Sequence, residues 1–412
     1  MKILCAFGRY NYGDPGRGEG YEYSSFLPAL RRLGHEVVHF ETWERGKFSN
    51  FAGLNLDFLE TVERENPDLI FCVLMHYELW LETLEIVRRG CRAVLVNWST
   101  DDSWKYPQFS RFVAPVFHAY ATTYPEALQK SLDDGLSNFL LTQWAANAEK
   151  LQEPLPAGQC RYSVSFVGSA YGNRPRWIAQ LGKRGIEVAC FGHGWPNGPV
   201  SAVDVPRIIR ESAISLNFGD SGIIMNGLIP RRSRQIKARI FEVPGAGGFL
   251  LTENADHLGN FYISGKEIAV FDGIDDLTAT IRHFLAHPGE RDRIATAGHA
   301  RTRAEHTYDL RFKSLLETAM RSSHVEDASQ AASREGCRID FSEFSALAKI
   351  HEAGWLMQVF RLCLLVPCMI LFGRKRGPRA ARRLLFEVSW RLGGRRTYSA
   401  AGLPGRLFYR ES

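Results

Sequence analysis

The first half of the chain alternates short apolar runs with amphipathic stretches. Unbroken apolar runs predict buried strands at 3–7, 36–40, 69–74, 93–96 and 119–122. Helical periodicity between them predicts helices at 23–33, 56–65, 79–88 and 125–132. Continuous apolar strands separated by helices are typical of a parallel sheet with both faces covered. The pattern therefore predicts an α/β, Rossmann-like domain over residues 1–150.

The same alternation starts again near residue 162. Strands are expected at 163–167, 187–191, 213–218, 248–251 and 268–271, and helices at 174–184, 205–211, 233–243, 277–286 and 289–305. The segment 145–159 carries Pro154 and Pro156 and is predicted to be a linker. A second Rossmann-like domain is thus expected over 160–320, and two such halves should hold a ligand in the cleft that they face.

Beyond residue 318 the α/β pattern ends. Residues 322–336 are polar and are expected to form a connector, and the tail that follows is basic: 361–412 holds twelve Lys or Arg and two Glu, a net charge of +10, which leaves −4 for the rest of the chain. The run 362–372 is wholly apolar, but as a helix it would cover only about half of a ~30 Å hydrocarbon core. Extension back to residue 353 includes Gln358 and Arg361, so the pattern leaves open whether 353–373 spans a membrane or only dips into it.

A basic amphipathic segment follows the apolar run. Cations cluster at 374–383, and farther along apolar and basic positions occupy different faces of a helix. This combination favours attachment of the tail, residues 323–412, to an anionic membrane surface through residues 353–396. A helix packed on the body of the protein and a nucleic-acid-binding tail are the alternatives, and nucleic acid is the less expected partner. The expected location is cytoplasmic, peripheral on the inner face of the plasma membrane.

The composition is that of a globular protein. The chain has 412 residues, of which 45% are hydrophobic and 23% charged. The apolar start at residues 1–7 is too short for a signal peptide and reads as a first strand. Eight cysteines are scattered without metal-ligand spacing, so we expect reduced, buried thiols in a cytosolic protein and no metal site.

The stretch 237–253 carries the most informative chemistry. Lys237 and Arg239 supply cations and Glu242 a carboxylate on a predicted helix, and a small-residue turn with Gly247 and Gly248 precedes the next strand. Cations and open backbone N–H groups suit phosphates, whereas a carboxylate suits ribose hydroxyls. The pattern predicts a site for a nucleoside diphosphate-sugar.

Two further turns in the second half suit the same ligand. Gly168 follows a strand, and Arg174 stands at the start of the next helix, an arrangement that favours phosphate binding. Trp195 follows the strand 187–191 and a glycine turn, where its ring could form a wall for a nucleobase. Tight-turn glycines are the alternative explanation of this second motif.

Candidate proton acceptors follow strands of the first half. Asp101 and Asp102 come after the fourth strand, and His76 comes just after the third. Any of them could act as a general base on an acceptor hydroxyl. A capping or structural role is equally open for each acid, and a structural histidine is the alternative for His76. The long glycine-rich loop 8–20 is expected to be either an acceptor-side lid or an irregular solvated loop.

Three blocks of this sequence resemble the CgeB-like glycosyltransferases. They are residues 98–104 with 121–125, residues 165–169 with Arg174, and residues 236–311, so the resemblance covers roughly 1–320. It implies the GT-B fold, with two Rossmann-like domains facing a cleft. It also implies transfer of a sugar from a nucleotide-diphosphate sugar to an acceptor, without an obligatory metal or other cofactor. The helical basic C-terminal extension is expected from this sequence itself and has no counterpart in the resemblance. A carbohydrate or lipid-linked acceptor of the envelope is expected because it would suit a membrane-attached tail.

The resemblance also implies residue roles in the second domain. Glu242 corresponds to the carboxylate expected on the donor ribose, and Arg174, Lys237 and Arg239 would stabilise the diphosphate leaving group. The glycines at 247–248 would let the backbone approach the donor.

One position departs from the family pattern. Retaining GT-B enzymes often carry a second glutamate eight positions before the first, and here that position is Arg234. The departure leaves the stereochemistry open. It also supports an alternative function, a catalytically inactive nucleotide-sugar-binding module that recruits partners to the membrane.

Overall fold

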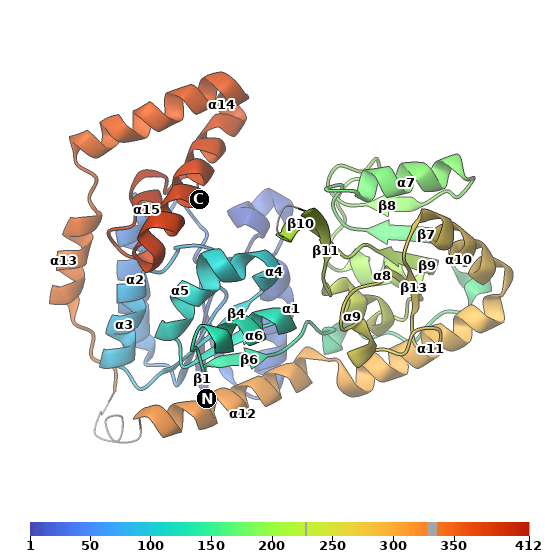
Figure 1. The fold of residues 1–412 in the computed structure, drawn as a ribbon. Helices are drawn as coiled ribbons and strands as arrows, with labels where there is room; N and C mark the ends of the chain where they lie inside the picture. Colours follow the sequence, from blue (N-terminus) through green and yellow to red (C-terminus); the bar gives the residue numbers. More distant parts are fainter. Residues whose placement is uncertain (227–228, 328–335, 412) are drawn as a thin grey trace. The chain divides into compact units, whose positions relative to one another are not determined.

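The chain forms two compact units, which are described separately. A computed structural model describes the backbone of residues 1–226, 229–327 and 336–411, and the side chains of these residues except those of 220–233 and 322–327. Unit 1 comprises Met1–Thr142 and Ser314–Ser412, and unit 2 comprises Gln143–Lys313. Figure 1 shows the elements of both units.

Unit 1 is built on a parallel sheet. In the described residues it has six strands in the order β2-β1-β3-β4-β5-β6, and each neighbouring pair is parallel. The strands are β1 Lys2–Ala6, β2 Glu36–Phe40, β3 Leu69–Cys72, β4 Val94–Ser99, β5 Ala119–Thr122 and β6 Phe139–Leu141. The predicted first five strands are confirmed, whereas β6 escaped prediction because it is short and ends at an exposed leucine.

Helices cover the sheet of unit 1. They are α1 Tyr21–Arg32, α2 Phe51–Glu65, α3 Leu81–Gly90, α4 Asp102–Lys105, α5 Arg111–Val113 and α6 Pro125–Asp133. The start of α2 is fixed by Asn50, whose side chain accepts a hydrogen bond from the Gly53 N–H at 3.2 Å. Phe58 and Leu84 of these helices join strand residues in one buried core, which is the arrangement that the unbroken apolar strands predict.

The C-terminal residues are part of unit 1. They form α12 Tyr308–Asp327, which begins in unit 2, then α13 Phe341–His351, α14 Trp355–Gly393 and α15 Leu403–Leu407. Phe344, Tyr398 and Tyr409 lie in the same buried core as the sheet. The tail expected over 323–412 is therefore packed rather than a separate appendage. Of the expected connector, 322–327 continue α12, and 328–335 lie outside the described residues.

Unit 2 contains a second parallel sheet. The described residues give it five strands in the order β13-β12-β9-β7-β8. Its strands are β7 Tyr162–Val167, β8 Ala189–Phe191, β9 Ser212–Asn217, β12 Leu250–Glu253 and β13 Ala269–Phe271. Its helices are α7 Arg174–Lys183, α8 Asp204–Arg210, α9 Arg239–Gly245, α10 Ile274–Ala286 and α11 Pro288–Glu305. All five predicted strands are confirmed.

An antiparallel hairpin interrupts the alternation in unit 2. Strands β10 Asp220–Asn226 and β11 Ile229–Arg234 pair with each other after β9. The helix predicted at 233–243 is wrong in its first half, because β11 continues to Arg234 and α9 begins only at Arg239. The end of β11 and the start of the predicted helix are both polar and arginine-containing, so periodicity alone did not place the boundary between strand and helix.

The predicted linker packs on unit 2. Gln152 donates its backbone N–H to the Gly245 carbonyl at 3.0 Å, and the Ala157 N–H donates to Asp292 Oδ1 at 2.9 Å. Arg291 of α11 is fully buried, and its guanidinium donates to the Leu155 carbonyl at 2.8 Å. The residues after 142 therefore belong to unit 2, although their prolines predict an extended connection.

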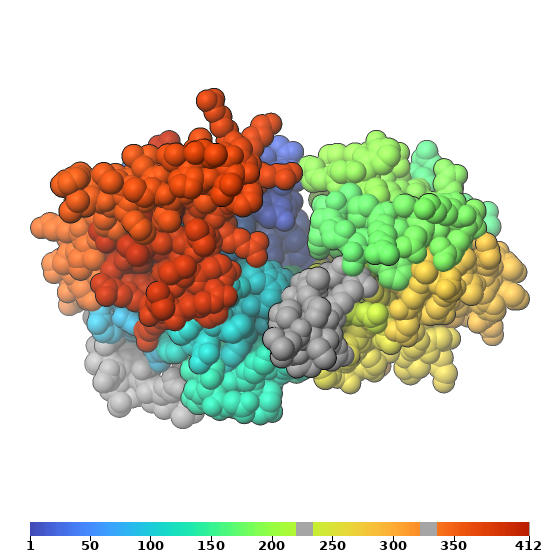
Figure 2. Space-filling view, turned by 45° about the horizontal axis from the view of Figure 1, so that its top comes forward, coloured from blue at the N-terminus to red at the C-terminus, as the bar shows by residue number. Residues whose placement is uncertain are grey.

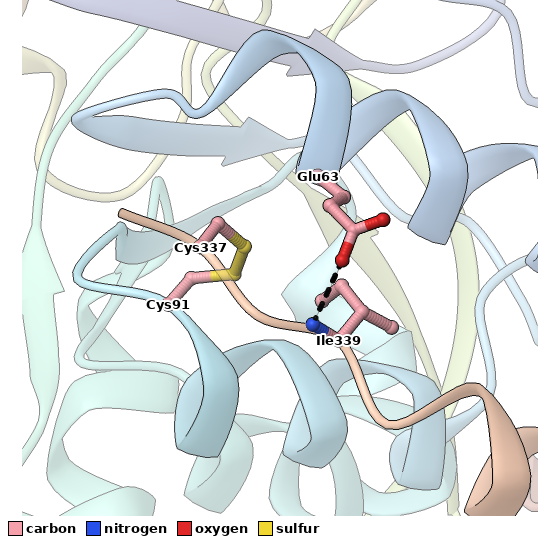
Figure 3. The surroundings of a disulfide bond; sticks show 4 residues. All are labelled: Glu63, Cys91, Cys337 and Ile339. Atoms are coloured by element: carbon pink, nitrogen blue, oxygen red, sulfur yellow. Dashed lines mark hydrogen bonds between the residues drawn. A yellow bond between two sulfur atoms is a disulfide. The ribbon is translucent and has the colours of Figure 1, made fainter. Parts of the chain in front are cut away.

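A disulfide joins Cys91, at the end of α3, to Cys337, ahead of α13 (Figure 3). Beside it, the Ile339 N–H donates to Glu63 Oε1 at 3.2 Å. The expectation that all cysteines are reduced is wrong for this pair, because linear spacing cannot show a contact between residues 246 positions apart. The other described cysteines are free thiols.

Candidate functional site

The cationic motif of unit 2 lies at the start of α9. Because α9 leads into the amino end of β12, its own first turn is directed toward the carboxyl edge of the sheet, where such folds bind ligands. Arg239 Nη1 lies 3.2 Å from Glu242 Oε2, with 22% and 20% of the two side chains exposed. Lys237 is half-buried just ahead of the helix. The structure thus brings together the two cations and the carboxylate that the sequence singles out.

The two glycines of this motif lie at the opposite edge of the sheet. A Cβ on Gly247 would lie 2.5 Å from the Gln152 carbonyl oxygen, and a Cβ on Gly248 would lie 2.6 Å from Ile209 Cγ2. Gly247 also has a left-handed φ of +78°, which favours glycine. Close packing explains both residues. The expectation that they admit a donor is therefore corrected: they precede β12, whereas the carboxyl edge follows it.

Two glycine turns lie side by side at the carboxyl ends of β7 and β8. The Gly168 N–H donates to the Phe191 carbonyl at 2.8 Å, and the Ala170 N–H donates to the His193 carbonyl at 2.8 Å. Trp195 closes this pair, because its Nε1–H donates to the Gly168 carbonyl at 2.7 Å. The indole is only partly exposed. The turn thus presents ordered backbone and one aromatic ring at the edge.

Arg174 is hydrogen-bonded to the turn that follows Gly168. Its Nη1 donates to the Ser169 carbonyl at 3.0 Å, its Nη2 donates to the Tyr171 hydroxyl at 3.2 Å, and its guanidinium stacks 4.1 Å from the centre of the Tyr171 ring. Only 8% of the residue is exposed. Arg174 therefore positions the Gly168 turn, and it presents little charge to solvent.

Glu253 and Arg234 form a further charged group at this edge, which the sequence did not predict. Glu253 ends β12 with none of its surface exposed, and its Oε2 accepts the Gly219 N–H at 3.0 Å. Arg234 Nε lies 3.3 Å from Glu253 Oε1, and its Nη1 lies 3.3 Å from Asp272 Oδ1. With 32% of its side chain exposed, Arg234 is a fixed cation at the carboxyl edge. The signal in the sequence was an acid at the end of a strand, the same signal that selected the aspartates of unit 1.

Asp102 in unit 1 is a buried structural group. Only 2% of it is exposed, and its Oδ1 accepts hydrogen bonds from Ser99 Oγ at 2.7 Å and from Ser110 Oγ. Ser110 in turn accepts from the Tyr120 hydroxyl at 2.9 Å. Burial raises the pKa of Asp102, and these hydroxyls oppose the rise. Its carboxyl group organises the end of β4 and is closed off from solvent.

Asp101 lies beside a buried lysine. Lys105 is 3% exposed, and its Nζ donates to the Met75 carbonyl at 2.9 Å. Burial lowers the pKa of Lys105, and the nearby Asp101 opposes that effect most among the surrounding acids. Glu22, in the first turn of α1, also faces Lys105, and burial together with Asp101 raises the pKa of its carboxyl. Glu22 was missed because an acid in a helix's first turn is expected for the helix dipole alone.

His76 is a half-buried imidazole that packs against α14. Burial lowers its pKa well below the usual value, and the positive charges of Lys105 and Arg382 add to the effect. Its ring packs 6.2 Å from the centre of the Phe386 ring of α14. A strongly lowered pKa makes His76 a weak proton acceptor. Of the three candidate bases, Asp101 and His76 are half-exposed, whereas Asp102 is buried.

The glycine-rich loop 8–20 is held to the segment after β2. A Cβ on Gly13 would lie 2.6 Å from the Trp43 carbonyl oxygen, and the Arg9 N–H donates to Glu41 Oε2 at 2.5 Å. Arg9 also pairs with Glu19 at 3.1 Å. The loop therefore has an ordered conformation next to Glu22. Within the described side chains, no three His, Cys, Asp or Glu residues gather closely enough to hold a metal ion.

Comparison with known proteins assigns the architecture. Residues 174–317 match the glycosyl transferase-like family. Sucrose-phosphate synthase from Thermosynechococcus elongatus superposes with a TM-score of 0.55 at 11% identity over 80% of this chain and 100% of that one. A glycosyltransferase from Rickettsia africae gives 0.55 at 11% identity over 78% and 98%.

HepE from Anabaena, solved in complex with UDP and glucose, gives a TM-score of 0.53 at 13% identity over 78% of this chain and 100% of that one. The fold is that of the GT-B glycosyltransferases. No curated protein matches the sequence. At these identities the GT-B likeness establishes the fold, and the chemistry must be argued from the residues of the chain itself.

Proposed function

We propose that this GT-B protein transfers a sugar from a nucleoside diphosphate-sugar to an acceptor hydroxyl. The observation that carries the proposal is the cluster of Lys237, Arg239 and Glu242 at the carboxyl edge of unit 2, inside the segment that matches the glycosyl transferase-like family. The CgeB-like resemblance of residues 236–311 is the finer assignment that we propose on the same basis. HepE was solved with UDP and glucose, which makes a uridine donor the first to test.

The proposed roles follow from charge and position. Glu242 accepts hydrogen bonds from the donor ribose, and Lys237 and Arg239 offset the charge that develops on the leaving diphosphate, so that side-chain cations supply this stabilisation without a metal. Arg234, fixed by two acids, is a third cation at the same edge. Arg174 keeps the Gly168 turn in place, so its effect on the donor is indirect.

The reaction joins the acceptor oxygen to the anomeric carbon while the bond from that carbon to the diphosphate breaks. The acceptor hydroxyl must lose its proton, and we propose that Asp101 receives it. Asp101 is half-exposed, whereas Asp102 is buried among hydroxyls and His76 is a weak base. Glu22 is the neighbouring acid, and burial together with the charge of Asp101 raises the pKa of its carboxyl.

A thermal-shift panel tests the donor assignment. A ligand present at about 100 times its Kd stabilises a protein by about 2.7 kcal/mol, which raises the Tm of a domain of this size by about 5–10 °C. We expect such a shift with one nucleoside diphosphate and with its sugar conjugate. If no nucleoside diphosphate or nucleotide-sugar changes the Tm, the proposed function is wrong.

A second function is supported by one observation. Arg234 occupies the position at which retaining enzymes often carry a glutamate, and Glu253 and Asp272 hold it there. A catalytically inactive module that binds a nucleotide-sugar and recruits partners to a membrane would tolerate that change. Donor hydrolysis separates the two functions, because a pure binding module releases no nucleoside diphosphate.

The acceptor and the location are proposed from the C-terminal residues. A cationic, partly apolar tail suits an acceptor borne by the envelope or by a lipid, and a peripheral position on the cytoplasmic face of the membrane. The Cys91–Cys337 disulfide is the feature that opposes this location, because such bonds are rare in a reducing cytosol. The redox state of this pair in cells therefore tests the location.

A further inference from the structure

Helix α14 is a hairpin with two arms. Its backbone leaves helical geometry at Gly373, where φ is +76°, so the residues 355–372 form a first arm and 374–393 a second arm. Figure 1 shows the second arm returning toward α15. The arms touch near the turn, since a Cβ on Gly377 would lie 2.6 Å from the Cα of Met369. Glycine at this position therefore allows the close reversal.

The inner side of the first arm is docked on unit 1. Cys368 packs in a buried cluster with residues of the second arm and of α15, among them Leu385 and Leu407. Arg361 Nε donates to the Leu407 carbonyl at 2.7 Å, and its Nη2 donates to Glu411 at 2.7 Å. Arg361, which interrupts the apolar segment in the sequence, therefore has hydrogen-bond acceptors within the folded protein.

The outer side of the first arm is apolar and uncovered. Nine large apolar residues on this arm are between 44% and 78% exposed: Trp355, Leu356, Val359, Phe360, Leu362, Val366, Ile370, Leu371 and Phe372. Of the exposed positions described in 355–372, only Gln358 is polar. Figure 2 shows this arm, in orange, on the surface. These side chains expose on the order of 1,000 Å², above the few hundred Å² of ordinary monomers.

Cations border the apolar surface at both ends. Arg374, Lys375 and Arg376 are exposed at the turn. Near the other end, a cavity of about 520 Å³ is lined by Arg361, Arg406 and Arg410, together with the acids Glu352 and Glu411 and uncharged residues. Cations that border an apolar face suit lipid phosphates above hydrocarbon, whereas exposed leucine, isoleucine and phenylalanine have no role in binding a nucleic acid backbone.

The course of the chain before and after the first arm limits how this apolar surface can contact a bilayer. The segment Trp355–Tyr398 is the one helical segment, among the described residues, that is long and apolar enough to cross a membrane. However, Phe344 before it and Tyr409 after it belong to the same buried core of unit 1. A crossing helix would leave these two residues on opposite sides of the membrane. The apolar arm must therefore enter and leave the bilayer on one side.

We propose that the first arm of α14 is a membrane anchor that lies in the plane of an anionic lipid bilayer. The outer apolar side enters the acyl boundary, and the cations at the turn contact lipid phosphates. The second arm carries Phe386 and Arg382 to His76 and Tyr77, just beyond β3. The anchor therefore holds the bilayer surface beside the acceptor-side residues of unit 1. That last statement rests on the proposed function, and it assigns an acceptor embedded in the membrane.

Vesicle flotation of the full chain tests the anchor. We expect flotation with vesicles of phosphatidylcholine and phosphatidylglycerol, and an at least tenfold lower partition coefficient for the combined change Leu356→Glu, Ile370→Glu and Leu371→Glu. Val203→Glu is the matched control, because Val203 is 84% exposed in unit 2. The proposal is overturned if the triple variant floats like the control, or if the unaltered protein fails to float.

The cations are tested by a second variant. Replacing Arg374, Lys375 and Arg376 with glutamine should weaken flotation on anionic vesicles and reduce its salt dependence, and should leave binding to neutral vesicles unchanged. If the unaltered protein does not float but is retained by DNA, and if this variant loses that retention, the tail binds nucleic acid and the proposal is overturned. Melting temperatures of all variants with and without nucleotide show whether each remains folded and whether donor binding survives independently of the anchor.

In-plane and spanning arrangements differ in sidedness. With one epitope at each end of the chain in sealed membrane vesicles, an in-plane anchor leaves both epitopes on the same face, where protease removes both together. Protection of one epitope while the other is cleaved would show that the arm spans the bilayer, and would overturn the proposal.

Discussion

The Glu242→Gln substitution tests the donor site with little disturbance of the fold. Gln keeps the size of the side chain and one carbonyl acceptor, but it loses the charge and the second acceptor oxygen. In the protein without ligand, Glu242 is engaged in an ion pair with Arg239 at 3.2 Å. The proposed function adds a ribose that donates its hydroxyl hydrogens to the carboxylate.

The magnitudes separate binding from stability. A hydrogen bond to a charged group contributes about 1.5–3 kcal/mol, so a net loss of about 2 kcal/mol corresponds to about 30-fold weaker nucleotide binding. The ion pair joins residues three positions apart on one helix and is partly exposed. Its loss should therefore cost less than about 1 kcal/mol of stability. The Tm without ligand should therefore fall by only a few degrees.

Calorimetric titration with the nucleotide from the thermal-shift panel is the assay, and Glu305→Gln is the matched control. Glu305 forms an ion pair with Arg301 at 2.7 Å within α11, and 49% of its side chain is exposed. The control should lose as little stability as Glu242→Gln and bind nucleotide with the affinity of the unaltered protein. Equal nucleotide affinity in the Glu242→Gln variant would refute the placement of the ribose.

Three further predictions concern structural residues. Gly248→Val should destabilise unit 2 by about 3 kcal/mol, because its side chain would overlap Ile209; calorimetric unfolding checks this, and Gly259→Ala, which meets no atom within 4 Å, should be nearly neutral. Burial raises the pKa of Asp102 above its ordinary value of 3.8, so the stability that this carboxyl contributes is complete below that value and is lost as pH rises through the raised pKa. Asp102→Asn removes this term, and urea unfolding at several pH values should therefore show the stability of the unaltered protein falling relative to the variant as pH rises; a constant difference would contradict the assignment. Cys91→Ser removes the Cys91–Cys337 disulfide and should lower the stability of unit 1 by about 2–4 kcal/mol; mass measurement of non-reduced peptides from the unaltered protein should show the two cysteines joined, and separate peptides would contradict the pairing.

The sequence predicted the parallel sheets well because buried strands leave a strong apolar signal. Strands β3 and β4 are wholly buried and were found within three residues of their ends. The signal fails where a strand is exposed or polar: β6 ends at an exposed leucine, and the arginine-rich β11 was not predicted, its last two residues having been assigned to the helix expected at 233–243. Register and pairing of such strands depend on neighbours far away in sequence, which periodicity cannot report.

The candidate site was predicted in part, and the physical reason differs between residues. Lys237, Arg239 and Glu242 are close in sequence and on one helix, so their proximity follows from local structure. The glycines at 247–248 look the same in a sequence whether they face a ligand or pack against a neighbouring segment. Glu22 and Lys105 became visible only when the fold placed α1 beside the end of β4.

The tail shows the same limit. Its apolar run and its cations were evident, but the sequence could not show that residues on both sides of the run share a core. That shared core is the reason for proposing an in-plane anchor in place of a crossing helix.

The most direct test of the account measures nucleoside diphosphate release by the full chain on anionic vesicles that carry extracted membrane lipids. With the donor identified by thermal shift, the account predicts release above the rate without protein, loss of that release in Asp101→Asn, and an unchanged nucleotide affinity in the same variant. Tight donor binding without any release of diphosphate, in solution or on membranes, would contradict the transferase assignment and favour a binding module.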